Sequence, residues 1–130
     1  MASLSKSEKG VTLIANNTEI VGDIRFSDQF FVSGKVVGNI LAEEDKATLV
    51  VGEGGTVSGE IRVPNAVVNG RVEGDLYVSK KVELAANAHI QGSVYYRLIE
   101  MELGAVIEGR LIHAEQPHAQ DVDDSASEQS

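Results

Sequence analysis

Three histidines are the residues of this chain best suited to acid–base or metal chemistry. His89 lies in the body of the 130-residue sequence, whereas His113 and His118 lie near its end. A zinc site needs three or four ligands that converge on one point, and the chain has no cysteine to complete such a set. The sequence therefore predicts no metal site and no catalytic histidine.

Two other patterns resemble active-site elements only in composition. The glycine-rich run VGEGGT at 51–56 lacks the Lys-Ser/Thr pair of a phosphate-binding loop, and no helix is expected after it. Glu60 and Arg62, like Arg71 and Glu73, are charges two residues apart, a spacing typical of the exposed face of a strand. We therefore expect no catalytic residues, no cofactor and no small-molecule substrate.

The glycines belong instead to a repeat. The unit apolar-x-Gly-x-apolar occurs eight times, at Ile20–Ile24, Val32–Val36, Val36–Ile40, Val57–Ile61, Val68–Val72, Val72–Leu76, Ile90–Val94 and Ile107–Leu111. A longer frame of about 17 residues relates six segments, at 12–26, 30–42, 49–63, 66–79, 82–96 and 99–113. Units this short cannot bury an apolar face alone, so the repeat indicates a stack of coils.

Within each unit the alternation indicates a half-buried strand. The two apolar residues and the glycine would share one face, and the inward glycine would mark a close approach of two backbones. Asn17, Gly54, Asn87 and Gly104 occupy equivalent places in four units. Because Gly and Asn tolerate positive φ best, we expect a left-handed residue at this corner.

These features favour an all-β, right-handed parallel β-helix of about six coils, which would be about 29 Å long at the usual strand spacing. A left-handed hexapeptide helix is less consistent with the sequence, because Gly38 breaks a strict six-residue phase. A β-sandwich would also suit the turn spacing. We expect the β-helix to span 11–113, between a flexible tail at 1–10 and a disordered acidic tail at 114–130.

Composition limits the classes of partner. The formal net charge is −9, and residues 114–130 contain five acidic residues and no Lys or Arg, which argues against nucleic-acid binding. The absence of cysteine suits a reducing, cytoplasmic location. No apolar run is long enough to span a membrane. Residues 1–10, whose one sizeable apolar residue is Leu4, are a candidate for a short amphipathic contact with the inner membrane.

The last unit differs from the others in its outward positions. Leu103, Val106 and Ile112 are apolar where equivalent units carry other residues: Asn16, Glu53 and Ala86 for Leu103; Glu19, Thr56 and His89 for Val106; Arg25, Arg62 and Tyr95 for Ile112. Apolar surface beside an open strand edge favours pairing with another copy. We therefore predict a polymer interface made of Leu103, Val106, Ile107, Leu111 and Ile112 at one end and Leu13 and Ile14 at the other.

Four features of the chain form a specific combination: the short N-terminal tail, the double-glycine motif from Val68 to Leu76, LVVGEGGTVSGEI at 49–61 and YRLIEMELGAVIEGRL at 96–111. Together they resemble the bactofilins, a family of bacterial polymer-forming cytoskeletal proteins, and the resemblance covers 11–113. It implies a right-handed β-helix that polymerises without nucleotide. It also implies a cytoplasmic scaffold, often at the membrane, that serves cell shape, polar organisation or localised wall synthesis.

We therefore expect a non-enzymatic scaffold that assembles end to end with itself and localises cell-wall or polarity proteins. Two alternatives remain open at this point: a β-helical acyltransferase-like enzyme, and a monomeric adaptor that recruits a partner through its acidic tail. Sedimentation would distinguish them, because the enzyme would form a small closed oligomer and the adaptor a single monodisperse species.

Overall fold

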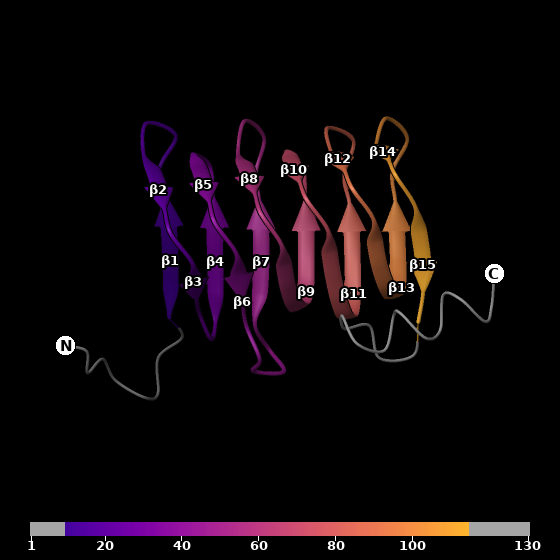
Figure 1. The fold of residues 1–130 in the computed structure, drawn as a ribbon, viewed down its shortest axis with the longest axis horizontal. Helices are drawn as coiled ribbons and strands as arrows, with labels where there is room; N and C mark the ends of the chain where they lie inside the picture. Colours follow the sequence, from indigo (N-terminus) through magenta and orange to yellow (C-terminus); the bar gives the residue numbers. More distant parts are fainter. Residues whose placement is uncertain (1–9, 115–130) are drawn as a thin grey trace.

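The computed structural model describes residues 10–114, which form fifteen short strands and no helix (Figure 1). The strands are β1 Val11–Ile14, β2 Glu19–Val21, β3 Ile24–Arg25, β4 Gln29–Val32, β5 Lys35–Val37, β6 Ile40–Leu41, β7 Thr48–Val51, β8 Thr56–Ser58, β9 Ile61–Val68, β10 Arg71–Glu73, β11 Leu76–Leu84, β12 His89–Gln91, β13 Val94–Met101, β14 Val106–Glu108 and β15 Leu111–His113.

The strands stack in parallel on three faces of a rod. The first face contains β1, β4, β7 and the later parts of β9, β11 and β13. The second contains β2, β5, β8, β10, β12 and β14. The third contains β3, β6, the earlier parts of β9, β11 and β13, and β15. The predicted all-β, parallel β-helix of about six coils is confirmed, and most of both predicted tails lies outside the described residues.

Columns of apolar side chains form the core between the three faces. On the second face, one column runs through Ile20, Val36, Val57, Val72, Ile90 and Ile107. Its four middle members are completely buried, whereas Ile20 and Ile107 in the terminal coils are partly exposed. Burying one such side chain contributes about 1.5–3 kcal/mol, so the stack of coils supplies the stability that one coil lacks.

The apolar-x-Gly-x-apolar unit spans two strands, so the prediction of a single strand is wrong. Ile20 lies in β2 and Ile24 in β3, and Gly22 forms the corner between them. The close backbone approach is confirmed, but it occurs between coils: a Cβ on Gly38 would overlap the carbonyl oxygen of Gly22. A Cβ on Gly59 would likewise overlap the carbonyl oxygen of Gly38. The φ of 149° at Gly59 is a second reason for glycine at this position.

The corner between the first and second faces corrects the expectation of a left-handed residue in four units. Gly54 and Gly104 have φ of 88° and 103°, but no non-glycine residue in 10–114 has positive φ, so Asn17 and Asn87 do not. In the Asn17 turn the amide of Thr18 donates to the carbonyl of Ala15 at 3.0 Å, so the turn closes without a left-handed residue.

The coils differ in length. Thr56 pairs with Lys35, which is 21 residues earlier, and with Arg71, which is only 15 residues later. An exposed loop at 43–46 takes up the extra residues of the longer step. The core columns therefore stay in register while the connections between strands vary.

Candidate functional site

The three histidines do not come together. His89 faces outward on β12, and its Nε2 lies 3.4 Å from Oε1 of Glu108 on the next coil. His113 is exposed on β15 with its ring against the edge of Tyr96, 5.5 Å between centroids, and His118 lies outside the described residues. Within 10–114, no three His, Cys, Asp or Glu side chains are grouped closely enough to hold a metal ion.

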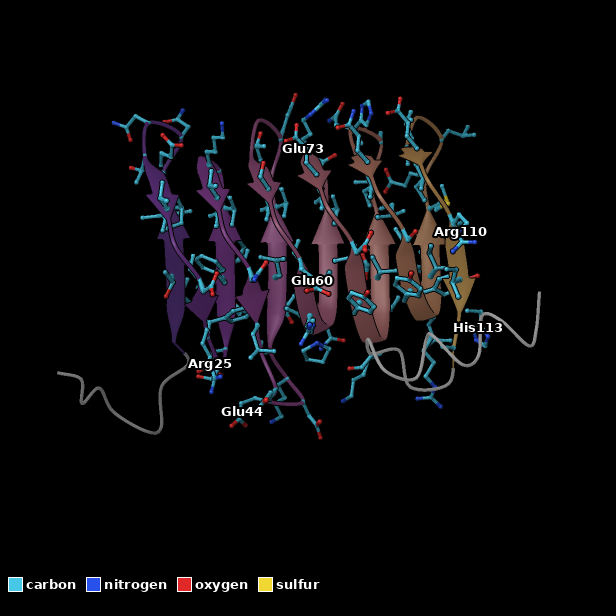
Figure 2. All side chains as sticks on the ribbon, in the orientation of Figure 1. Arg25, Glu44, Glu60, Glu73, Arg110 and His113 are labelled. Atoms are coloured by element: carbon cyan, nitrogen blue, oxygen red, sulfur yellow. The ribbon has the colours of Figure 1, made fainter. Side chains whose placement is uncertain are left out.

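The charged pairs predicted for the strand surface are confirmed. Arg62 contacts Glu60 at 3.1 Å, and Arg71 contacts Glu73 at 2.9 Å, all with exposed or partly exposed side chains. Hydrogen bonds from Arg71 and Ser58 lower the pKa of Glu73. Figure 2 shows Glu60 and Glu73 on the outside of the coils. Pairs this exposed contribute little to stability.

The glycine-rich run at 51–56 forms the corner between β7 and β8. The amide of Gly55 donates to the carbonyl of Gly52 at 2.8 Å, and a Cβ on Gly55 would overlap the carbonyl oxygen of Val32 in the coil before it. The run therefore has a structural role in coil stacking, as its alignment with other corners predicts.

The candidate site consists of the two ends of the rod, where the core is cut open. At the C-terminal end the inward columns finish at Met101 and Leu111, which are 47% and 44% exposed. Their partners one coil earlier, Leu84 and Val94, are 1% and 0% exposed. The same kind of side chain is thus buried by a following coil in the middle of the rod and uncovered at its end.

Further predicted interface residues surround this cut core. Leu103 lies in the turn before β14 and is 96% exposed. Val106 ends the outward column that contains His89 and is exposed, while Ile107 points inward and is partly buried. The last coil therefore brings Leu103, Val106, Ile107 and Leu111 to one end of the rod.

Ile112 requires a correction. Its outward column on the third face runs Arg25, Leu41, Arg62, Tyr77, Tyr95 and Ile112, so the column is not apolar only in the last coil. Tyr77 and Tyr95 stack with their centroids 4.5 Å apart, and Ile112 packs against this pair. Ile112 therefore extends a cluster on the side of the rod.

The N-terminal end has a similar cut core. Ile14, predicted from the sequence, points inward and is partly buried, whereas Leu13 faces outward on β1 and is 62% exposed. Ile20 and Ile24 also belong to this end. Sequence reasoning missed them, as it missed Met101, although each begins or ends a column of inward apolar residues.

Both ends also present open strand edges. Among the described strands, β1, β2 and β3 pair only with the following coil, and β14 and β15 pair only with the preceding one. Figure 1 shows these edges at opposite ends of the rod. Unpaired backbone donors and acceptors beside apolar surface are a template for another chain.

The comparison with family models decides the family. Residues 12–112 match the model described as "Bactofilin: Polymer-forming cytoskeletal". The chain belongs to the bactofilin family. It is 30% identical over 100 residues to Bactofilin BacO of Myxococcus xanthus (strain DK1622), a match that covers 77% of each chain.

The fold of this bactofilin also matches a solved structure, "Atomic structure of the cytoskeletal bactofilin BacA revealed by solid-state NMR". The TM-score is 0.59 at 24% identity, and the match covers 82% of this chain and 98% of the other. This bactofilin is thus a member of a polymer-forming cytoskeletal family. In the part of the chain that the structure describes, no helix is long and apolar enough to cross a membrane.

Proposed function

We propose that this bactofilin is a non-enzymatic scaffold that assembles end to end into filaments without nucleotide. The cut core at the two ends carries the proposal, because Met101 and Leu111 leave water only if another surface covers them. Each fully buried side chain of this size contributes about 1.5–3 kcal/mol. A subunit with an adhesive surface at each end joins two neighbours, so the assembly is an open filament.

The other parts of the proposal concern location. The filament is cytoplasmic and contacts the inner membrane through residues 1–10, and it localises cell-wall, cell-shape or polarity proteins along its sides. Membership of a polymer-forming cytoskeletal family supports the scaffold. A rod whose ends are used for assembly leaves its sides accessible to other molecules.

The first test examines the purified chain in chelator and without nucleotide. We expect filaments by electron microscopy and a large pellet by ultracentrifugation. Filaments that appear only after addition of a nucleoside triphosphate would contradict nucleotide-independent assembly. A small closed oligomer under all conditions would contradict the scaffold itself.

The second test changes the C-terminal end with a matched control. Val106→Arg should abolish filaments, because the guanidinium would be buried at the contact without a partner, a cost of about several kcal/mol. The single rod should tolerate it, since Lys35 and Arg71 occupy the same outward column. Gln91→Arg adds the same charge one coil earlier, beside Glu73 and Glu108, and should still form filaments.

Circular dichroism should show unchanged β-structure in both variants. Equal filament yield from Val106→Arg and Gln91→Arg would show that the contact lies elsewhere than the C-terminal end.

A further inference from the structure

The first face of the rod has two outward rows that carry no charge over four coils. One row, in register across β1, β4, β7 and β9, is apolar and consists of Leu13, Phe31, Val50 and Val67. The row beside it is uncharged and consists of Val11, Gln29, Thr48 and Asn65. We call these two rows the uncharged face. Both other faces carry charged outward residues along the same stretch, such as Arg25 and Lys35.

Core packing does not require the apolar row. In the fifth and sixth coils the same column contains Glu83 and Glu100, on β11 and β13. Lys81 in the neighbouring row lies 3.6 Å from Glu83 and 3.3 Å from Glu100. The fold therefore accepts a charged residue at these positions, and the change from apolar to acidic is a property of the surface.

We propose that the uncharged face is a lateral interface with a second copy of this chain in a neighbouring filament; this proposal rests on the filament proposed above. The four strands pair without a bulge and present two straight rows of side chains. Such a surface suits sheet-on-sheet packing at about 10 Å. The rows also begin at Leu13, beside the cut core of the N-terminal end, so the lateral and end surfaces are continuous.

The size of the face indicates how it works. Four strands at the usual spacing and two rows of side chains cover on the order of 250 Å², far below the roughly 800 Å² per partner of a stable interface. Two single rods would therefore not pair through it. A filament repeats the face once in every subunit, and the many weak contacts add because each one holds the next in place.

The charges argue for a second filament rather than a membrane. A membrane-binding face usually places Lys or Arg around its apolar residues to attract anionic lipids. The two rows of the uncharged face contain no Lys or Arg, and the Lys81 that continues one row contacts Glu83 and Glu100, which continue the other. The net charge of −9 repels neighbouring filaments at long range, so salt should promote the lateral contact by screening that repulsion.

The test compares Val50→Glu with Thr56→Glu, two variants with the same added charge in the same coil. Thr56 lies on the second face in a column between Lys35 and Arg71. Wild-type filaments at about physiological salt should form bundles that sediment at low speed. Val50→Glu should reduce the low-speed pellet at least tenfold and leave single filaments that sediment only at high speed, whereas Thr56→Glu should bundle normally.

Two substitutions of Glu83 test the same face by increasing bundling. Glu83→Val extends the apolar row into a fifth coil and should bundle at lower salt than wild type. Glu83→Gln removes the same charge without adding an apolar group, so it should produce a smaller shift.

The remaining outcomes separate this proposal from the one on which it rests. Equal bundling of Val50→Glu and Thr56→Glu, or single wild-type filaments at every salt concentration, would overturn the lateral interface alone. Flotation of wild type but not Val50→Glu with phosphatidylglycerol vesicles would instead assign the face to a membrane and overturn the proposal. Absence of wild-type filaments would overturn the proposed function as well.

Discussion

Leu76 in the middle of the rod and Leu111 in its last coil stand in one inward column, but Leu76 is completely buried and 44% of Leu111 is exposed. The same residue type therefore has two different consequences. In the middle, burial by the next coil stabilises the fold. At the end, the same surface is free to meet another molecule, so substitutions along one column separate folding from assembly.

The largest difference in stability should separate two glycine substitutions, one in the middle of the rod and one in its first coil. Gly59→Ala would place a Cβ against the carbonyl of Gly38 at a φ of 149°, and overlap and backbone strain together should cost about 3–5 kcal/mol. Gly22→Ala, in the first coil, meets no atom within 4 Å and should cost only the strain, about 1–2 kcal/mol. Urea unfolding in a Val106→Arg background would measure both without a contribution from assembly. Equal costs would contradict the close stacking of coils.

The column of Leu76 and Leu111 provides the next comparison. Leu76→Ala should destabilise the rod by about 2–5 kcal/mol because it leaves a cavity in the core. Leu111→Ala should cost about 1 kcal/mol or less, since no coil covers it, but it should raise the protein concentration needed for filaments. Unfolding midpoints and pelleting curves would measure the two effects. A loss of stability without a change in assembly for Leu111→Ala would argue that the last coil is not a contact.

A smaller effect concerns the carboxylate of Glu108, whose contacts join the last two coils. The contact with His89, and then the hydrogen bond from Gln91, lower the pKa of Glu108 from its usual 4.5. These contacts favour the ionised carboxylate, so their contribution to the stability of the last coil is present above pH 4.5 and is lost as the pH falls through the lowered pKa. NMR titration of Glu108 should show its pKa rise towards 4.5 in His89→Gln, while the pKa of Glu73 in the middle of the rod stays low because Arg71 is unchanged.

Removal of the two tails should have the smallest effect on folding and filament formation. A chain reduced to residues 11–113 should keep its β-type circular dichroism and still form filaments, because the apolar columns and the cut ends all lie within this range. Loss of the five acidic residues of 114–130 should lower the repulsion between filaments and increase bundling. Failure of the shortened chain to fold would identify a tail as a cap of the rod.

The columns that could be predicted are those whose spacing is regular. The long units alone align Glu19, Thr56, His89 and Val106, and the structure places all four in one outward column. Side-chain alternation and the repeated glycine are enough for this, because they fix which face each residue occupies. The two cut ends follow from the same alignment.

The column of Ile112 could not be completed in this way. Leu41 and Tyr77 belong to the two-glycine units, whose coils differ in length from the long ones, so a fixed shift of 17 residues does not reach them. Hydrogen bonds between neighbouring strands decide which residues pair there. Likewise, Asn17 and Asn87 match glycines in sequence, but their turns close without positive φ, a choice that residue type leaves open.

The loop at 43–46 has a practical consequence for imaging in cells. It absorbs the longest step between paired strands, and Glu44 points away from the rod in Figure 2, far from either end in the order of coils. A coil that already accommodates extra residues here should accept a short epitope or a split fluorescent-protein strand. A label inserted at this loop would mark each subunit of a growing filament and leave both of its ends unblocked.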